Sequence, residues 1–370
     1  MIHRLYVHHY RCLENFELRL KEMPSSLLIG GNGSGKSTVG SVIELLQRVG
    51  RGKNRVGELV EVADFCRGCT DRPIRFEVDV ELSGRLYSYL LALELPPHFR
   101  ELRISKEALT VDGEEVFSRN QAELSLLRAG RTIQFLVDWH LVALPVIQEQ
   151  SPEDPLLVFK TWLSNVIVLA PLPQLIGGES ETETLQPEHD GQNYASWLTG
   201  LLAFYPASYS TMATYLAGVM PDLLDFRNER TGKSSKSLVT RFRRGGTTLE
   251  VDFERLSAGE KCYFICAALL AMHEHHGPLF CFWDEPDAHL SLSEVGQLVV
   301  TLRRAFKRNG QVVLTSHASE AVRRFSDENT LLLSRRSHLD PTTVRPIKDL
   351  KLEGDLVDAL IQGDLDDGDQ

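Results

Sequence analysis

Apolar positions follow two spacings along this chain, and each spacing predicts a kind of element. Three short runs are continuously apolar over the length of a strand, which is typical of buried parallel strands. They are Ser26–Ile29, Leu279–Trp283 and Val312–Leu314. Apolar residues also recur at helical spacing over Val39–Val49 and fill Tyr263–Met272. We therefore expect an α/β fold in which strands alternate with helices.

Other segments place an apolar residue at every second position, which predicts half-buried antiparallel strands. Ile74–Val80 and Tyr87–Leu93 show this period of two. Leu238–Phe253 has two extended halves around Gly245-Gly246, the composition of a hairpin turn. This hairpin would present Arg241, Arg243 and Arg244.

The segment Gly30–Thr38 directly follows the first apolar run and fits the pattern G-x-x-x-x-G-K-[ST]. Its glycines let the backbone turn close to a polyphosphate, so that successive N–H groups point inward. We expect Lys36 to reach the β- and γ-phosphates and the Ser37 hydroxyl to ligate Mg²⁺. The helix that follows would place its N-terminus under the phosphates. The order of strand, loop and helix favours a nucleotide site over an ordinary glycine-rich loop.

Two carboxylates, Asp284 and Glu285, follow the second apolar run. The carboxyl ends of parallel strands form the edge of the sheet where ligands bind. Asp284 is therefore placed to hold Mg²⁺ through its water shell, and Glu285 to orient and deprotonate an attacking water. The alternative is an acidic turn before Pro286, which the upstream phosphate loop makes less favoured.

Two further motifs surround this acidic pair in the sequence. Leu256–Lys261 begins a predicted helix, where Ser257 and Gly259 offer a hydroxyl and free N–H groups to an anion. The third apolar run ends in Thr315-Ser316-His317, which would set His317 beside the γ-phosphate. A single histidine is usually an ordinary surface or core residue, so this role depends on the order of all four motifs.

In that order, the motifs resemble those of the ABC-type AAA family ATPases of the RecF, SMC and OLD group. The resemblance extends nearly end to end. The phosphate loop, an LSAGEK signature, a WDEPDAHLS segment that contains Asp287 and His289, and the LTSH histidine all occur. Leu5–Phe16 looks like the N-terminal hairpin of these proteins, and Asp190–Tyr194 is similar to the segment that opens their inserted helical part. The chain is most similar to compact members without a long coiled coil or a Toprim domain.

The resemblance implies a P-loop ATPase head with an antiparallel side sheet and an inserted helical lobe. It implies ATP and Mg²⁺ as cofactors, Glu285 and His317 as catalytic residues, and Ser37 and Asp284 as Mg²⁺ ligands. The residues implied to bind the nucleotide are Gly30, Asn32, Gly33, Ser34, Gly35, Lys36, Ser37, Thr38, Ser257, Gly259, Glu260 and Asp287. In this family the signature serine and glycine act across a homodimer, on ATP held by the partner's phosphate loop.

Two departures from the family pattern concern single residues. Relatives place a glutamine that contacts Mg²⁺ between the phosphate loop and the inserted part. After Gln47, inside the first predicted helix, the next glutamine here is Gln121, so the chain shows no clear counterpart. The signature has Ala258 where many relatives have glycine or aspartate, a small change that should not block a phosphate contact.

We expect four parts along the chain. Residues 1–176 form the N-terminal part of the head with the phosphate loop and side sheet, and 177–236 a linker and the inserted lobe, helical over 193–227. Residues 237–335 complete the head with the signature, acidic pair and histidine, and 336–370 form an extension whose acidic tail we expect to be disordered. Since a long coiled coil needs about three or four consecutive heptads, which are not found, we expect no SMC-like arms.

Composition agrees with this assignment. The chain of 370 residues is 42% apolar, enough to bury a substantial core, and its net charge of −11 argues against a uniformly basic surface that coats nucleic acid. Local basic runs remain at 48–55 and 241–244, either as nucleic-acid patches or as solvated loops.

Six cysteines, mostly in apolar surroundings, predict a reducing cytoplasm. Tyr263–Met272 falls far short of the roughly 20 residues of a membrane span, and Cys66–Cys69 alone is only half a zinc site.

Two hypotheses for the role of the chain follow from the resemblance. In the first, a homodimer hydrolyses ATP and couples this to DNA maintenance or to defence against phage and plasmids, with duplex DNA as a partner. Because too few residues follow His317 for a nuclease domain, a separate nuclease or toxin would act as effector. In the second, a slow ATPase mainly serves as a scaffold or inhibitor of such a partner, without binding DNA. The acidic net charge mildly favours the second.

Overall fold

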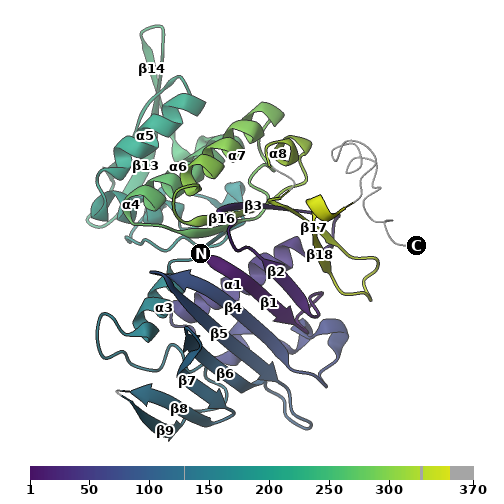
Figure 1. Ribbon diagram of the computed structural model, residues 1–370. Helices are drawn as coiled ribbons and strands as arrows, with labels where there is room; N and C mark the ends of the chain where they lie inside the picture. The colour runs from purple at the N-terminus through teal and green to yellow at the C-terminus, as the bar shows by residue number, and fades with distance from the viewer. Residues whose placement is uncertain (129, 326–327, 351–370) are drawn as a thin grey trace. The chain divides into compact units, whose positions relative to one another are not determined.

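The computed structural model describes residues 1–128, 130–325 and 328–350 (Figure 1). The chain divides into two compact units. Unit 1 comprises Met1–Val166 and Phe325–Gln370, and unit 2 comprises Ile167–Arg324. The four-part division expected from the sequence is finer than this one and stays a prediction.

Unit 1 contains an antiparallel sheet of eight strands in the order β2-β1-β4-β5-β6-β7-β8-β9 (Figure 1). Its strands are β1 (Ile2–His8), β2 (Phe16–Arg19), β4 (Ile74–Leu82), β5 (Arg85–Glu94), β6 (Arg103–Val111), β7 (Glu114–Asn120), β8 (Glu123–Arg128) and β9 (Arg131–Leu136). The alternation seen in the sequence sets one face of β4 into the core, where Ile74, Phe76 and Val78 are buried. The predicted antiparallel strands and the N-terminal hairpin of β1 and β2 are confirmed.

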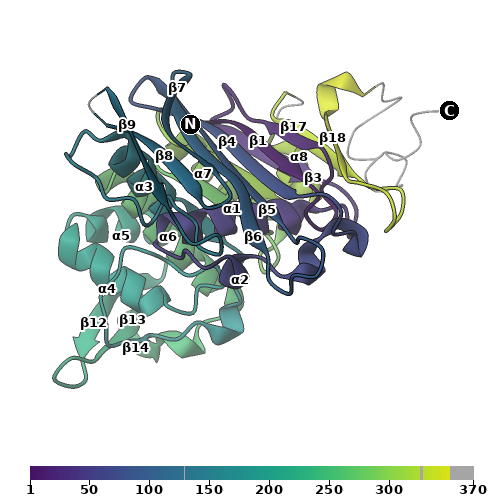
Figure 2. The same cartoon turned by 90° about the horizontal axis from the view of Figure 1, so that it is seen from below.

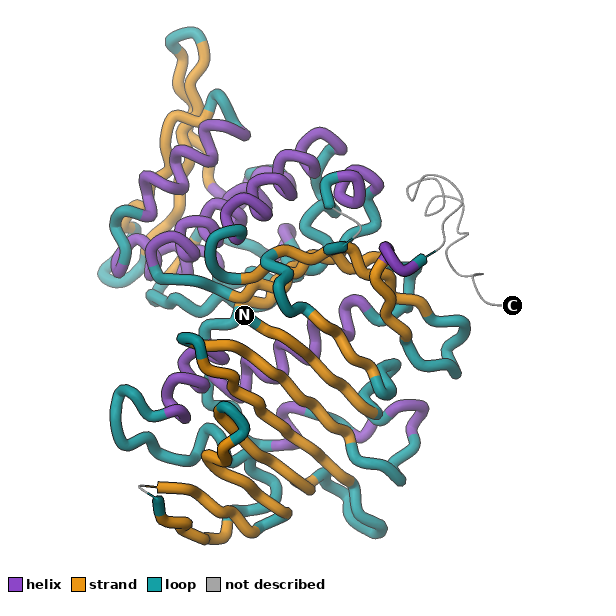
Figure 3. The backbone as a smooth tube through the Cα atoms, in the orientation of Figure 1, coloured by secondary structure: helices purple, strands orange, loops and turns teal. Residues whose placement is uncertain are grey.

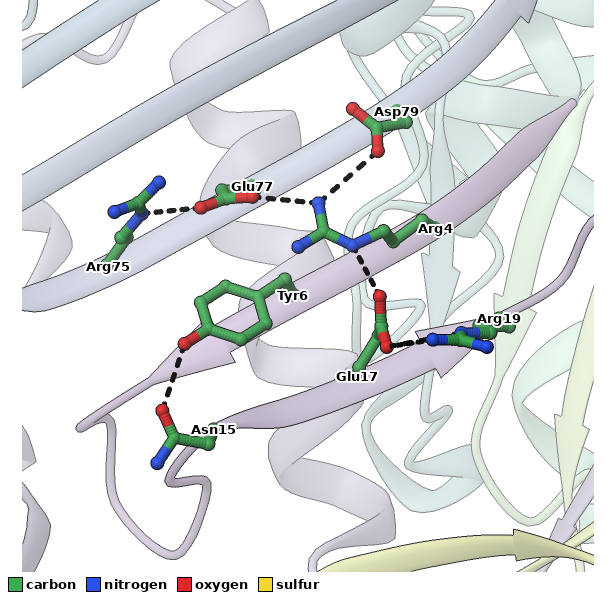
Figure 4. A network of polar contacts seen from close by, with 8 residues as sticks. All are labelled: Arg4, Tyr6, Asn15, Glu17, Arg19, Arg75, Glu77 and Asp79. Carbon is green, nitrogen blue, oxygen red and sulfur yellow. Dashed lines mark hydrogen bonds and ion pairs between the residues drawn. The ribbon is translucent and has the colours of Figure 1, made fainter.

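The opposite face of this sheet carries a charged network (Figure 4). Arg4 on β1 lies 2.6 Å from Glu17 on β2, and 2.7 and 3.3 Å from Glu77 and Asp79 on β4. Arg19 and Arg75 extend the chain of alternating charges. Since opposite charges face each other across neighbouring strands, the network supports the register of β2, β1 and β4.

Helices cover the apolar face of the sheet in unit 1 (Figure 2). They are α1 (Lys36–Gly50), α2 (Val56–Leu59) and α3 (Pro155–Ser164). Phe159 of α3 places its ring against Tyr87 and Tyr89 of β5. Helix α1 packs beside α3, and Gly50 permits this approach because a Cβ there would lie 2.7 Å from the Ser164 amide nitrogen.

A second group of strands in unit 1 holds the phosphate loop. It consists of β3 (Ser25–Ile29), the parallel strand β17 (Thr330–Ser334) and the antiparallel strand β18 (Thr343–Pro346). All five residues of β3 are buried, its two serines as well as the apolar residues 27–29. The loop therefore leaves a fully buried strand and enters α1.

Unit 2 has a parallel group of three strands, with helices α6 and α7 in contact with each other. The strands are β10 (Ile167–Leu169), β15 (Phe280–Trp283) and β16 (Gln311–Thr315), in that order. The helices of the unit are α4 (Tyr194–Phe204), α5 (Ser208–Val219), α6 (Ala258–His275), α7 (Leu292–Phe306) and α8 (Ser319–Arg323). The apolar runs predicted as strands at 279–283 and 312–314 are confirmed.

A small antiparallel sheet completes unit 2 and corrects one expectation. Its strands are β11 (Glu179–Ser180), β12 (Leu223–Arg230), β13 (Lys236–Arg244) and β14 (Thr247–Asp252). The helical lobe expected over 193–227 ends with α5 at Val219, and the prediction of helix is wrong for 223–227. These residues pair with β13 instead, which buries Phe226. The predicted hairpin around Gly245-Gly246 is confirmed, and Figure 3 shows it extending away from the helices of its unit.

Candidate functional site

The phosphate loop in unit 1 has the backbone that its glycines permit. Gly30, Gly33 and Gly35 have φ of 149°, 78° and 102°, a region that other residues rarely adopt. Gly30 is also crowded, because a Cβ there would lie 2.1 Å from the Leu333 carbonyl oxygen on β17. Gly31, Asn32 and Gly33 are exposed, which leaves the loop open to a ligand.

Lys36 begins α1 and turns back across the loop. Its ammonium group donates to the carbonyl oxygens of Gly30 at 2.8 Å and Gly31 at 3.2 Å. Ser37 lies exposed in the first turn of α1. The hydroxyl of Thr342 stabilises the loop by donating to the Ser34 carbonyl oxygen at 2.9 Å. The loop is thus preformed around a cation.

A cavity of about 340 Å³ opens on this loop within unit 1. It is lined by Gly33, Gly35, Ser37, Thr38, Arg11, Cys12 and Arg335. Among the residues that the structure describes, its lining includes two arginines and no carboxylate, which suits an anionic ligand. A cavity of about 530 Å³ elsewhere in the unit, beside β2 and β18, is lined by both acidic and basic residues and includes none of the phosphate loop. We therefore take the smaller one as the candidate nucleotide cavity.

Sequence reasoning assigned no role to Arg11, Cys12 or Arg335. Arg11 follows β1 at φ 49°, and its guanidinium donates to Asp64 at 2.8 Å and to Ser41 of α1 at 3.2 Å. Arg335 follows β17 directly and donates to backbone carbonyl oxygens of the next turn. Pairing of β17 with β3 brings Arg335 to the cavity, and the contacts with Asp64 and Ser41 hold Arg11 there. These contacts join residues distant in sequence, so no local motif indicates them.

The acidic segment in unit 2 leaves the carboxyl end of β15, as predicted. Asp284 donates its amide hydrogen to Leu169 of the neighbouring strand β10. Glu285 has φ 47°, a left-handed conformation that costs energy for a residue with a Cβ. Its amide donates to the Thr315 hydroxyl at 2.9 Å. The strained turn is thereby held by the end of the neighbouring strand β16.

Three consecutive residues that begin with the last residue of β16 each contact one carboxylate of the acidic segment. The Thr315 hydroxyl donates to Asp284 Oδ1, and the Ser316 hydroxyl donates to Asp287 Oδ2 at 2.8 Å. His317 Nε2 lies 3.3 Å from Glu285 Oε1. The structure thus places Asp284, Glu285 and Asp287 each in contact with one residue of the segment 315–317.

The carboxylates differ in their surroundings. The side chains of Glu285 and His317 are 48% and 42% exposed, so their contact is weak and opens at little cost. Asp287 is more enclosed, and burial raises its pKa. Its Oδ1 has no hydrogen-bond partner among the described residues.

The signature lies at the N-terminus of α6 in unit 2. Ser257 caps the helix by accepting from the Glu260 amide at 3.3 Å, and Glu260 accepts from the Ser257 amide and hydroxyl at 2.7 Å. Gly259 packs against the segment after Asp287, since a Cβ there would lie 3.0 Å from the His289 carbonyl oxygen. Lys261 is buried and donates to two carbonyl oxygens, of Pro173 and Ile176.

Searches for two other kinds of site were negative over the described residues. No helix in 1–128, 130–325 or 328–350 is long and apolar enough to cross a membrane. No group of three or more His, Cys, Asp or Glu side chains in the same ranges gathers in a way that could hold a metal ion.

Solved structures match the chain over nearly its whole length. The crystal structure of an SMC head bound to the C-terminal winged-helix domain of ScpA covers 93% of this chain and 97% of its own, with a TM-score of 0.55 and 14% identity. An Smc head domain with an extended coiled coil, bound to the C-terminal domain of ScpA derived from Pyrococcus furiosus, covers 94% and 96%, with a TM-score of 0.53 and 13% identity.

The chain has the fold of an ABC-type P-loop ATPase head. No protein-family model and no curated protein matches its sequence. The sequence predicts an antiparallel side sheet and a helical lobe for such a fold. Unit 1 contains the sheet, and unit 2 contains the helices. The roles of the individual site residues stay predictions.

Proposed function

We propose that this chain binds Mg²⁺-ATP and hydrolyses it, and that two copies close around two nucleotides during each cycle. The observation that carries the proposal is the arrangement of Asp284 and Glu285 at the end of β15, held by Thr315 and His317. The phosphate loop and its cavity in unit 1 give separate support. The match of the ATPase-head fold over 93% of the chain includes both units.

The residues of unit 1 suit a polyphosphate. The loop amides at Gly33 and Gly35 are exposed or line the cavity, and Lys36, Arg11 and Arg335 supply positive charge. Ser37 and Asp284 carry the oxygen atoms that Mg²⁺ prefers, and we propose them as its ligands. When bound there, Mg²⁺ would supply positive charge to offset the negative charge of the phosphates.

Glu285 would orient a water and accept its proton, and in the structure its carboxylate contacts His317 instead. Because the His317 contact is half-exposed, Glu285 can exchange it for a water without a large penalty. Ser257, Gly259, Glu260 and Asp287 would complete the site of a second copy. Ser257 must then release its hydroxyl hydrogen from Glu260 in order to donate to a phosphate.

Hydrolysis by the Glu285→Gln variant tests the proposal. The amide cannot accept a proton, so steady-state phosphate release should fall at least about a hundredfold, within the usual range for a general base. ATP affinity, measured by titration with a fluorescent analogue, should stay within about twofold. Turnover at the parental rate would contradict the role of Glu285, and a parental protein that neither binds nor hydrolyses ATP would contradict the proposed function.

We further propose, as a RecF/SMC/OLD-like role, that the cycle acts on duplex DNA in maintenance or defence with a separate effector. The basic run at 48–55 is a poor candidate surface, because Arg48 and Lys53 both contact Glu58. In the β13–β14 hairpin Asp225 neutralises Arg241. Arg243 and Arg244 are exposed, and no contact of their side chains is seen within the described residues.

Duplex DNA should therefore stimulate the ATPase, with an effect that weakens steeply as salt rises. Reversing both charges in an Arg243→Glu/Arg244→Glu variant should remove the stimulation and leave basal turnover intact. A Lys21→Glu/Lys106→Glu variant carries the same charge change on exposed residues of unit 1 and should keep it. Absence of any DNA effect on the parental protein would favour the second hypothesis, a slow ATPase that acts as a scaffold or inhibitor of a toxin or nuclease.

A further inference from the structure

The hydroxyl of Thr315 makes two hydrogen bonds that join the two proposed catalytic carboxylates. It accepts from the Glu285 amide at 2.9 Å and donates to Asp284 Oδ1. A hydroxyl has one hydrogen, and the bond from the amide leaves that hydrogen for Asp284. The Thr315 side chain is fully buried at the end of β16, so its position is fixed by packing.

These bonds act on the carboxylate group of Asp284 and on the backbone turn at Glu285, both of which catalysis would need. One carboxylate oxygen of Asp284 is committed to Thr315, while Oδ2 carries no hydrogen bond within the described residues. The amide that Thr315 binds belongs to the residue with φ 47°, whose conformation needs support from its surroundings. Thr315 thus sets both the rotation of Asp284 and the turn that aims Glu285.

Neighbouring residues repeat the pattern. Ser316 is also buried and bonds Asp287, and its hydroxyl accepts from the Ala318 amide at 2.9 Å. His317 follows with its contact to Glu285. The end of β16 therefore fixes the acidic segment at three successive points, of which Thr315 is the most buried.

We propose that Thr315 is a positioning residue that orients the Asp284 carboxylate toward Mg²⁺. The inference rests on the proposed function, since it concerns the metal that accompanies ATP. Hydrogen bonds to metal-binding carboxylates typically change metal affinity by about 10- to 100-fold when they are removed. The effect of losing Thr315 should therefore be seen in the Mg²⁺ dependence and not in nucleotide binding without metal.

The test compares Thr315→Val, which keeps the shape and removes the hydroxyl, with Thr315→Ser, which keeps the hydroxyl. A fluorescent ATP analogue is titrated in EDTA, and Mg²⁺ is then titrated at a fixed analogue concentration. For the valine variant we expect parental affinity in EDTA and a half-saturating Mg²⁺ concentration raised about tenfold or more. The serine variant should lie within about threefold of the parental protein.

Two results would overturn the inference. An unchanged Mg²⁺ dependence in Thr315→Val would show that the hydroxyl does not position the metal ligand. An equal loss of analogue binding in EDTA would indicate general damage to the fold, as would a valine variant that fails to melt cooperatively. In that last case Thr315→Cys, similar in size and a weaker hydrogen-bond donor, replaces it in the same titrations. If the parental protein shows no Mg²⁺-dependent binding of the analogue, the proposed function itself fails. The Thr315 inference fails separately, when the parental protein binds the analogue with Mg²⁺ and Thr315→Val does so equally well.

Discussion

Among single residues, Lys36 has the plainest link between sequence and chemistry. Its ammonium group lies buried against two carbonyl oxygens of the loop that its own motif defines. A buried cation of this kind is costly to hold unless its hydrogen bonds are satisfied. A phosphate bound in the loop would bring negative charge close to an ammonium group that is already in place.

Replacing Lys36 by alanine should weaken ATP binding by at least about tenfold, because a hydrogen bond to a charged group contributes about 1.5–3 kcal/mol. Titration with a fluorescent ATP analogue measures the change. Lys53→Ala is the matched control, since Lys53 follows the same helix but pairs with Glu58 on the surface. Equal affinity in Lys36→Ala and the parental protein would contradict the phosphate role of the loop.

Single residues also show what the sequence could and could not predict. Lys36, Asp284 and Glu285 were predictable because their surroundings are local, namely a strand and the turn that follows it. Arg11 and Arg335 were not, because contacts between distant parts of the chain bring them to the cavity. Thr315 lay inside a recognised motif, yet its two bonds depend on the register of β15 and β16.

The N-terminus of helix α6 has a structural role, as a capped helix end, and a proposed functional role in binding a nucleotide. Its cap Ser257 forms a capping box with Glu260, as does Ser291 with Glu294 on α7. A capping hydroxyl contributes about 1 kcal/mol whatever else it binds. The cap alone therefore does not show that Ser257 meets a phosphate.

The two capping serines form a matched pair for experiment. Ser257→Ala and Ser291→Ala should each lower the free energy of unfolding by about 1 kcal/mol in urea denaturation. Only Ser257→Ala should also reduce ATP hydrolysis, because only this hydroxyl is proposed to act on a nucleotide. Parallel loss of activity in both variants, or in neither, would argue against a signature role for Ser257.

Strands β5, β6 and β7 contribute a buried charge cluster to unit 1. Glu107 accepts from the Tyr89 hydroxyl at 3.0 Å and from the Ala143 and Leu144 amides at 2.7 and 2.8 Å. Arg119 lies 3.8 Å from it, and both side chains have no exposed surface. Burial raises the pKa of Glu107. The cluster ties the chain at 143–144 to the sheet.

Removing the Glu107 carboxylate would take the acceptor from the Tyr89 hydroxyl and from the amides at 143–144. Arg119 would keep its bonds to backbone carbonyl oxygens but lose its buried counter-charge, so Glu107→Ala should destabilise the protein by about 3–5 kcal/mol. Urea denaturation gives the value, with exposed Glu114→Ala on β7 as a control expected within about 0.5 kcal/mol. A change below about 1 kcal/mol in Glu107→Ala would mean that the cluster does not hold this segment.

Elements differ in how well their pattern predicted them. The buried strands β3, β15 and β16 and helices α1 and α6 were predicted because continuous or periodic apolar runs dictate them. Residues 223–227 of β12 lie in the segment expected to be helical, and Leu223 and Phe226 suit either spacing in so short a segment. Pairing with β13 decides between the two, and pairing partners cannot be read from a single segment.

At the scale of the whole molecule, the proposed cycle requires two copies of the chain to meet around ATP. Residues of the signature in unit 2 would serve a nucleotide held by the phosphate loop of another copy, so one chain alone lacks part of each site. The ATPase-head fold agrees with this expectation but leaves it to be tested. A variant that binds ATP and cannot hydrolyse it should trap the closed state.

The most direct measurement is the mass in solution of the Glu285→Gln variant, by light scattering after size exclusion, with and without Mg²⁺-ATP. We expect a species of 41.6 kDa without nucleotide and one of twice that mass with it. A Lys36→Ala/Glu285→Gln variant should stay monomeric under both conditions. A Glu285→Gln protein that binds ATP and remains a monomer would contradict closure of two copies around the nucleotide.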